Sequence, residues 1–329
     1  MPLLIIVSPA LAAANNGNWQ TAWRWSRLLS GHYRTRIVKD WQAGQDEDAV
    51  AMLALHARRS AASIQAWATA HPGRGLGLVL TGTDLYRDID SDASAQRSLA
   101  LAQQLVVLQE LGAQRLPPAH RHKTRVIFQS TSTRRTLSKS TRQLRAVMVG
   151  HLREEKSPQT LFQAARLLRE RPDIHIDHIG APLDPALGEQ ARRTAAECPN
   201  YRWLGGLDRE ATRQRIQRAH VLVHCSRMEG GAHVLMEAVC SGTPVLASRI
   251  DGNVGMLGAD YAGYFPWGDA KALANLLLRC RDDARGGGQG SASIFSGLQA
   301  QCRIRAPLFE AAAERAALLA LLQDLIQNP

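Results

Sequence analysis

The segment Ser226-Arg227-Met228-Glu229-Gly230-Gly231-Ala232-His233-Val234-Leu235-Met236-Glu237 joins two regions of different periodicity. The apolar run 219–225 predicts a buried strand, and the helical spacing of 234–240 predicts a helix that stops at residues 241–244. Free backbone N–H groups and the positive end of the helix dipole meet where such a helix begins, so this turn favours anionic ligands. Glu229 and Glu237 flank it. A ligand with phosphates in its middle and hydroxyls at both ends, such as a nucleotide sugar, suits this layout.

Strands and helices alternate along the chain, which is typical of an α/β protein whose parallel sheets are covered on both faces. In the first half, apolar runs predict strands over 3–7, 35–38, 48–55, 76–81, 104–108 and 125–128, with helices near 19–29, 60–71 and 94–99. In the second half, strands are predicted over 145–149, 174–179, 201–204, 221–224 and 244–247, with helices over 158–170, 185–197, 209–218 and 234–240.

The polar, hydroxyl-rich stretch 129–141 between the two halves predicts a linker. We therefore expect two doubly wound, Rossmann-like domains, at 1–130 and 145–285, joined by a polar and basic linker at 131–144. The cleft between such domains is the expected ligand site. Residues 286–329 are expected to hold a flexible glycine-rich break and a C-terminal helix, near 307–326, that packs across the domains.

The composition is that of a soluble globular protein, with 329 residues, 45% hydrophobic and 21% charged. No apolar run is long enough for a membrane span, and residues 3–7 lack the features of a signal peptide, so we expect a cytoplasmic protein without membrane partners. Five scattered cysteines form no CxxC pair, which favours reduced thiols over a zinc site.

The net charge of +11 suits either polyanionic small substrates or nucleic acid. The densest basic runs, 120–125 and 133–145, have only Phe128 as an aromatic neighbour. Because single-stranded nucleic acid needs several stacking surfaces, nucleic-acid binding is the less favoured interpretation.

A second candidate for phosphate binding follows the predicted strand 145–149. The strand ends at Gly150, and Arg153 and Lys156 precede a helix start at Ser157-Pro158. Two cations at the carboxyl end of a central strand could clamp a diphosphate as it leaves. The alternative is a solvated basic loop paired with its own glutamates.

Four features in the first half also admit two interpretations each. The loop Asn15-Asn16-Gly17-Asn18 predicts either a phosphate-approaching turn or a plain polar loop. Asp84 could orient a substrate or transfer a proton, or it could cap a turn. His56 could belong to a site or to the structure. The run Asp88-Ile89-Asp90 has the spacing of a metal motif, but an acidic loop is the favoured interpretation and no metal site is expected.

The ordered set of Gly150 to Lys156, Glu229-Gly230-Gly231, Glu237-Ala238 and Gly242 to Val245 resembles the GT-B glycosyltransferases of the retaining family 4 over nearly the whole chain. The resemblance implies a GT-B fold, that is, two Rossmann-like domains facing a central cleft. It also implies donor-binding roles for the residues that match. The residue matching Glu237 binds the ribose hydroxyls, and the one matching Glu229 lies beside the donor sugar.

The same resemblance implies that the amides of 231–234 approach the phosphates and that Lys156 neutralises the leaving diphosphate. Two positions depart from the family pattern. His151 stands where the family has arginine, so we expect Arg153 to supply that charge. Thr81 stands where the family has histidine, which puts the ordinary acceptor geometry in doubt.

A narrower set of segments is similar to the selenosugar synthases of selenoneine biosynthesis: 16–18, 55–60, 80–89, 149–153, 226–232, 252–258 and 263–266. This resemblance implies UDP-N-acetylglucosamine, or a related UDP-sugar, as donor and selenophosphate as acceptor. A C–Se bond forms, UDP and phosphate are released, and the product passes to a C–Se bond-forming enzyme of the selenoneine pathway. No cofactor or metal is expected.

The expected site residues fall into three groups. The catalytic group is Glu229, Lys156 and Arg153. The UDP-sugar group is Glu237, Gly230, Gly231, Ala232, His233, Val234, His151, Gly17 and Asn18. The acceptor group is Asn16, Arg24, His56, Arg58, Arg59, Thr81, Thr83, Asp84 and Arg87.

Selenophosphate is already anionic, so it needs little general-base help but does need cations. The arginines of the acceptor group could hold it. Three alternatives remain from the sequence: an ordinary glycosyltransferase with an alcohol or phosphate acceptor, a UDP-sugar epimerase, and a nucleic-acid-binding protein.

Overall fold

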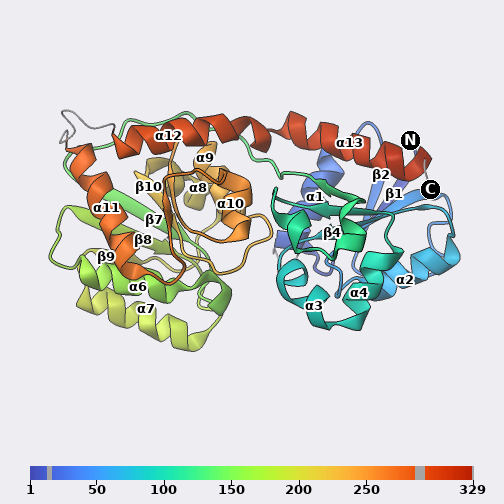
Figure 1. Cartoon of the computed structure of the whole chain (residues 1–329), viewed down its shortest axis with the longest axis horizontal. Helices are drawn as coiled ribbons and strands as arrows, with labels where there is room; N and C mark the ends of the chain where they lie inside the picture. Colours follow the sequence, from blue (N-terminus) through green and yellow to red (C-terminus); the bar gives the residue numbers. More distant parts are fainter. Residues whose placement is uncertain (13–16, 286–292, 328–329) are drawn as a thin grey trace. The chain divides into compact units, whose positions relative to one another are not determined.

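The computed structural model describes residues 1–12, 17–285 and 293–327, which divide into two compact units (Figure 1). Unit 1 combines residues 1–130 with residues 308–329, and unit 2 spans residues 131–307. Within the described residues, each unit has one parallel six-stranded sheet with helices packed against it. The predicted α/β class with two doubly wound, Rossmann-like domains is confirmed.

The sheet of unit 1 has the strand order β2-β1-β3-β4-β5-β6, and all of its pairs are parallel. Every residue of β1 and β4 is buried, because helices cover both faces. The strands are β1 (Leu3–Val7), β2 (Arg34–Val38), β3 (Ala49–Leu55), β4 (Gly75–Leu80), β5 (Gln104–Val107) and β6 (Thr124–Val126). They agree with the predicted strands to within three residues at each end.

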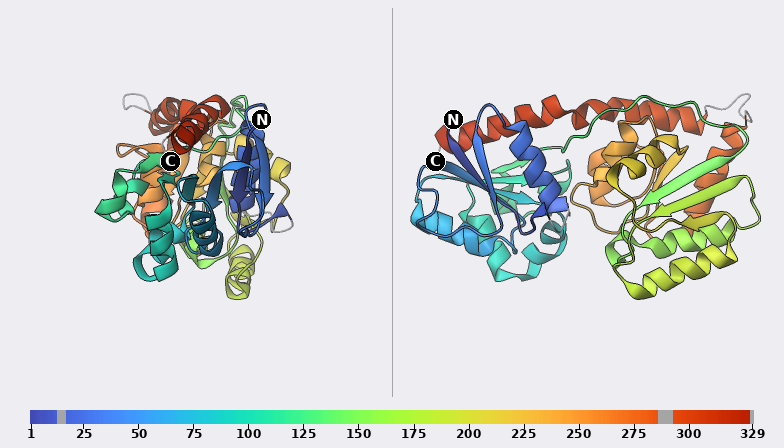
Figure 2. Two further views of the ribbon diagram at one scale, coloured as in Figure 1. Left: turned by 90° about the vertical axis from the view of Figure 1, so that its right-hand side faces the viewer. Right: turned by 180° about the vertical axis from the view of Figure 1, so that it is seen from behind.

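Two hydrophobic cores lie on opposite faces of this sheet. One is formed with α2 (Ala61–Ala70) and α4 (Ala93–Leu101), and the other with α1 (Gly17–Leu28) and α13 (Ala311–Gln327). Although α13 is far from α1 in sequence, the two helices lie side by side (Figure 2). The remaining helical segments are η2 (Asp84–Asp88), α3 (Ile89–Ser91), η3 (Gly112–Arg115) and α5 (Pro118–Arg121).

The sheet of unit 2 has the order β12-β11-β10-β7-β8-β9 and is also parallel. Its strands are β7 (Leu144–Val149), β8 (Ile174–Ile179), β9 (Tyr201–Trp203), β10 (Val221–His224), β11 (Val245–Ser248) and β12 (Tyr264–Phe265). The strand order reverses between β7 and β10. In open α/β sheets, ligands bind beyond the carboxyl ends of the strands at such a switch point.

Helices surround this second sheet (Figure 1). They are α6 (Pro158–Leu167), α7 (Pro185–Glu197), α8 (Arg209–Arg218), α9 (His233–Val239), α10 (Asp251–Leu257), α11 (Ala270–Ala284) and α12 (Ile294–Arg305), with a short turn η4 (Glu154–Lys156) after β7. The predicted helices α6 to α9 are confirmed. The sequence analysis did not predict the elements from α10 to α12.

The predicted linker lies along unit 2, and its backbone is fixed there by hydrogen bonds. Arg134 donates its N–H to the Cys240 carbonyl (2.8 Å), and the Gln217 amide donates to the Arg135 carbonyl (2.8 Å). The glycine-rich break at 286–292 lies outside the described residues. The C-terminal segment forms a short turn η5 (Ala306–Phe309) before α13, which packs on α1, β3 and β4 of unit 1.

Candidate active site

The glycine turn of unit 2 follows β10 and leads directly into α9. His224 is the last residue of β10, Glu229 lies in the turn, and α9 begins at His233. Gly230 and Ala232 are buried in the turn. The backbone amides of the first turn of α9 therefore lie beyond the carboxyl end of β10, as the sequence predicts.

An ion pair joins the segments that follow β7 and β10, the two strands at the switch point. Lys156 Nζ lies 2.5 Å from Glu229 Oε1, and His224 Nε2 lies 3.4 Å from the same oxygen. Both charged side chains are largely buried, at 16% and 11% exposure. Burial alone would raise the pKa of Glu229, but the charge of Lys156 and the hydrogen bonds from His224 and Lys156 outweigh it. The pKa of Glu229 therefore lies well below its usual range.

A glycine lies close to each member of this pair. A Cβ on Gly150 would touch the aliphatic stem of Lys156 at 3.4 Å, so the lysine lies against the end of β7. A Cβ on Gly252, the second residue of α10, would lie 2.9 Å from the carbonyl carbon of Glu229 and 3.0 Å from its Cβ. Glu229 is therefore held between η4 and the start of α10.

Buried polar contacts connect the same turn to neighbouring elements. Ser248 Oγ donates to the carbonyl of Ser226 (2.5 Å), and the Asn253 amide donates to the carbonyl of Ser248 (2.8 Å). The N–H of Ala232 points at the sulfur of Met256 (3.2 Å). These contacts tie the turn to the end of β11 and to α10, both of which come after the motif in sequence.

His151 and Arg153 follow β7 on the exposed side of the switch point. The Ala181 N–H donates to His151 Nδ1 (3.1 Å), so the neutral ring carries its proton on Nε2. Burial and the charges of Arg153 and Lys156 lower the pKa of His151. Its ring can therefore offer an N–H to an anion. Arg153 is 47% exposed and lies 4.0 Å from Glu155. Two interpretations of Arg153 were open from the sequence, a phosphate clamp and a solvated loop residue. This weak pairing agrees fully with neither of them.

Glu237 lies in the second turn of α9, where it faces two arginines of α8. Arg213 Nε lies 3.9 Å and Arg209 Nε 4.0 Å from its carboxylate, which is 9% exposed. Burial raises the pKa of Glu237, and the arginines oppose this only in part. Arg213 is itself held by linker residues, because it donates to Thr131 Oγ1 (2.9 Å) and to the Ser132 carbonyl (2.6 Å).

His224 and Arg213 were not among the predicted site residues. His224 could have been predicted, because it is a polar residue at the carboxyl end of an apolar strand. Arg213 had none, because its buried position depends on packing between α8 and the linker.

In unit 1, seven of the nine predicted acceptor residues lie in the segments that directly follow β3 and β4: His56, Arg58, Arg59, Thr81, Thr83, Asp84 and Arg87. His56 is buried with a φ of 75°, in the left-handed region, and its Nε2 lies 3.1 Å from Thr83 Oγ1. The Arg59 N–H approaches the other ring nitrogen, Nδ1, at 3.4 Å. Burial, against the raising effect of nearby Asp84, lowers the pKa of His56. The ring is therefore neutral at pH 7 and has both nitrogens engaged.

Asp84 caps the turn after β4. Its Oδ1 accepts from the N–H groups of Thr81 (2.9 Å) and Gly82 (2.8 Å), and its Oδ2 accepts from Ala57 (3.0 Å). The side chain is fully buried. Of the two interpretations of Asp84, the structure favours the turn cap over a proton-transfer group.

The acceptor-side arginines differ in how they are paired. Arg58 (2.8 Å) and Arg87 (3.2 Å) both contact Asp88, which shares their charge. Among the described residues, no carboxylate pairs with Arg59, which is exposed. Arg24 instead pairs with Glu314 of α13, and its Nε–H is shared between the two carboxylate oxygens (3.1 and 3.0 Å). Its charge, expected to serve an anionic substrate, is neutralised within unit 1.

The other expected residues of this loop are only partly described. Gly17 and Asn18 are the first residues of α1, and Asn16 lies outside the described residues. The acidic run at 88–90 is held by arginines, since Arg115 pairs with Asp90 at 3.1 Å. Across residues 1–12, 17–285 and 293–327, no three His, Cys, Asp or Glu side chains gather as a metal site would require. That the donor and acceptor residues share one cleft stays a prediction.

Comparisons with known proteins show similarity to glycosyltransferases. Residues 129–284 match the family model of Glycosyl transferases group 1. The chain is 23% identical over 270 residues to glycosyltransferase 1 domain-containing protein 1 of Xenopus tropicalis, across 74% of this chain and 78% of that relative. In the described part of the chain, no helix has the length and apolar character that crossing a membrane requires.

Solved structures show the same fold at low identity. HepE of Anabaena, in complex with UDP and glucose, is 16% identical and covers 98% of this chain and 100% of its own, with a TM-score of 0.74. A mutant of TarM from S. aureus, in complex with fondaparinux, α-GlcNAc-glycerol and UDP, is 13% identical over 83% of this chain, with a TM-score of 0.64. This chain spans 55% of the TarM chain. The fold is therefore GT-B.

Proposed function

We propose that this chain, a glycosyltransferase of the GT-B fold, transfers the sugar of UDP-N-acetylglucosamine or a related UDP-sugar to selenophosphate. The carbon–selenium bond forms at C1 of the sugar, the C1–O bond to the diphosphate breaks, and UDP leaves with the bonding electrons. Water then cleaves the phosphate from selenium, which gives a 1-seleno sugar and inorganic phosphate. The observation that carries the proposal is the buried pair of Lys156 and Glu229 beside the first turn of α9.

The donor half of the proposal rests on unit 2. A lysine ammonium and the free amides of a helix start together match a diphosphate whose negative charge grows as the C1–O bond breaks. Glu237, one helical turn further on, can accept hydrogen bonds from ribose hydroxyls. HepE and TarM, which share the fold, were both solved with UDP.

Glu229 has two tasks in this mechanism. As an anion it holds the Lys156 ammonium in place, with the two groups 2.5 Å apart. Its second carboxylate oxygen can accept from a hydroxyl of the donor sugar. When the diphosphate arrives, Lys156 can interact with both anions, so no metal ion is required to balance the leaving group's charge.

The acceptor half of the proposal rests on what the residues of unit 1 cannot do. Both nitrogens of His56 are engaged, and both carboxylate oxygens of Asp84 accept backbone amides. Neither is available to remove a proton from a neutral hydroxyl. An acceptor that is already ionised, such as selenophosphate, avoids this requirement. Arg59 and the arginines around Asp88 supply positive charge for its phosphate.

The rival function is transfer to an alcohol, as the α-GlcNAc-glycerol in the TarM complex suggests for that protein. The rates of UDP release with selenophosphate, thiophosphate, inorganic phosphate and glycerol as acceptors separate the two. We expect selenophosphate to be used fastest and glycerol at the background rate of donor hydrolysis.

The Arg59→Gln variant refines this test. It should raise the KM for selenophosphate about tenfold, since it removes one charge-assisted contact, with Arg34→Gln as an exposed control. A rate with glycerol that exceeds the rate with selenophosphate would show that the alcohol acceptor is correct.

A further inference from the structure

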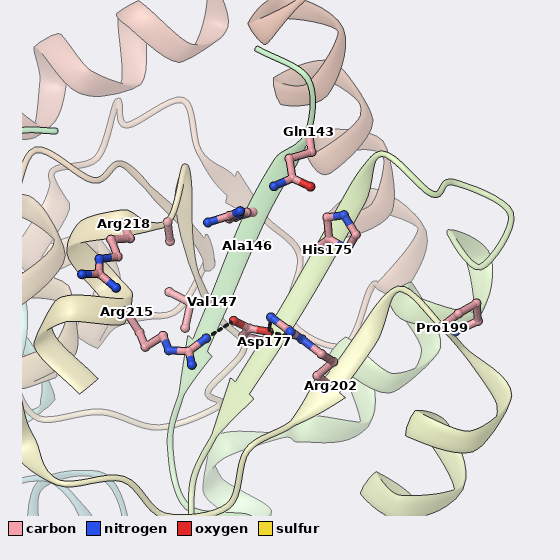
Figure 3. Close-up of a pocket in the computed structure, with 11 residues that line it drawn as sticks. Gln143, Ala146, Val147, His175, Asp177, Pro199, Arg202, Arg215 and Arg218 are labelled. Atoms are coloured by element: carbon pink, nitrogen blue, oxygen red, sulfur yellow. Dashed lines mark hydrogen bonds and ion pairs between the residues drawn. The ribbon is translucent and has the colours of Figure 1, made fainter. Parts of the chain in front are cut away.

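Unit 2 has a pocket of about 510 Å³ whose lining includes none of the expected donor residues. It is lined by the first residues of β7, β8 and β9 and by the C-terminal end of α8 (Figure 3). Its volume falls within the range of small-molecule sites. We call it the basic pocket, because four arginines line it: Arg145, Arg202, Arg215 and Arg218.

The basic pocket lies at the opposite end of β7 from the donor residues. Arg145 is the second residue of β7, whereas Gly150 follows its last residue. Five residues of extended strand span about 16 Å, so a ligand held by Arg145 does not occupy the diphosphate position beside Lys156. The pocket is therefore a separate place on unit 2.

The pocket has a strong excess of positive charge. Its four guanidinium groups face a single carboxylate, Asp177, which leaves three positive charges in excess. Asp177 lies between two of the arginines, 2.7 Å from Arg202 Nη2 and 3.1 Å from Arg215 Nη1. Because a guanidinium has five N–H groups, these contacts hold both arginines in place and leave most of their donors for a ligand (Figure 3).

The other two arginines have no acidic partner among the described residues. Arg218 makes no ion pair there, and Arg145 contacts only a neutral amide. With its oxygen toward Arg145, the Gln143 amide accepts from Arg145 Nε (2.9 Å), and its nitrogen donates to His175 Nε2 (2.9 Å). The side of the pocket formed by Arg145 and Arg218 therefore carries positive charge that no carboxylate neutralises.

The lining also limits the kind of anion that fits. None of the lining residues is Phe, Tyr or Trp, so the pocket has no surface on which a nucleic-acid base would stack. Arginines recognise phosphate by paired N–H donors. The chemistry of the pocket therefore favours a small molecule with two or three phosphate groups over single-stranded RNA.

We propose that the basic pocket binds a small polyphosphorylated molecule at a site separate from the transferase centre. The pocket shares α8 with the donor site, because Arg209 and Arg213 of the same helix face Glu237. Its ligand is thus held next to the helix that supports the ribose-binding carboxylate. The proposal does not depend on which acceptor the enzyme uses.

Calorimetric titration of the full chain with inorganic tripolyphosphate tests the proposal. The pocket variant is Arg145→Gln/Arg218→Gln, whose two side chains are exposed, so it is expected to fold. The control is Arg279→Gln/Arg303→Gln, which removes the same charge from exposed positions outside the pocket. Lys156→Met, measured in parallel, removes the diphosphate clamp of the donor site. The single variant Arg218→Gln serves if the double variant is unstable.

We expect the pocket variant to bind tripolyphosphate at least about tenfold more weakly at this site, because each lost contact to a charged group costs more than a neutral hydrogen bond. The control should stay within about twofold, and Lys156→Met should retain the pocket's binding event. Equal affinity in the pocket variant and the wild type would overturn the proposal, as would equal weakening in the control. Tighter binding of a single-stranded RNA through the same two arginines would assign the pocket to nucleic acid instead.

Discussion

A methyl group on Gly252 tests how Glu229 is positioned. In Gly252→Ala, the new Cβ would lie 2.9 Å from the carbonyl carbon of Glu229 and 3.0 Å from its Cβ, and closer still to its carbonyl oxygen. Carbon atoms in contact need about 3.5–4.0 Å and the carbonyl oxygen is closer still, so either the turn or α10 must move by about 1 Å. A displacement of 1 Å in a catalytic group costs up to about 100-fold in rate.

The expected result is a fall in kcat of about 10- to 100-fold, with a loss of stability of about 1–3 kcal/mol from overpacking. The dissociation constant of UDP should also rise, because the displaced turn leads into the first-turn amides of α9 that face the diphosphate. UDP release under saturating donor measures the first effect, and calorimetry the second. Gly297→Ala is the control, since a Cβ there meets nothing within 4 Å, and it should leave kcat unchanged. A Gly252→Ala enzyme with wild-type kcat would refute the positioning argument.

Three further predictions use the same geometry. Lys156→Met removes the charge that keeps the pKa of its partner carboxylate low, so the acid limb of the rate profile should move to higher pH; an unmoved limb would separate the pair from catalysis. Because the folded-state pKa of Glu237 is raised, its protonation should weaken UDP binding at a pH above the usual range of glutamate, and Glu237→Gln should abolish this dependence in a pH series of titrations. Arg24→Met leaves Glu314 buried with one cation fewer, so chemical unfolding should show a loss of about 3–5 kcal/mol, against at most about 1 kcal/mol for the exposed pair of Arg34.

The sequence predicted the elements whose residues are buried on a regular period. Strands such as β1 and β4 are continuous apolar runs because both of their faces are covered, and α6 to α9 have clear start and stop residues. After β11, α11 does have buried residues at helical spacing (Leu273, Leu276, Leu277 and Cys280), and the prediction overlooked it. The shorter elements of this segment have no such pattern. α10 has seven residues with two internal glycines, and β12 has two residues, so neither is long enough to show a period.

The candidate site was predictable where chemistry follows from neighbouring residues. Glu229 and Glu237 lie in one motif, and the strand, turn and helix around them follow from local spacing. His224 and Arg213 complete the electrostatics of the two carboxylates through contacts that folding creates. The role of Asp84 was undecided for a related reason, since the same residue type serves as cap and as base. Only the three amides around Asp84 distinguish these roles.

The glycines around the site illustrate the same limit. Gly252 has no unusual neighbours in the sequence, yet the close approach of Glu229 requires it. Gly180 is similar, because a Cβ there would collide with the backbone of Gly150. These close backbone contacts join segments that are distant in sequence, so the local sequence pattern does not predict them.

The product of one reaction tests the central claim most directly. The chain is incubated with UDP-N-acetylglucosamine and selenophosphate, and the sugar product is analysed by mass spectrometry beside the amount of UDP released. We predict a 1-seleno-N-acetylglucosamine that shows the isotope pattern of selenium and matches UDP one for one. UDP release without any selenium-containing sugar, or a faster transfer to an alcohol in the same mixture, would contradict this account.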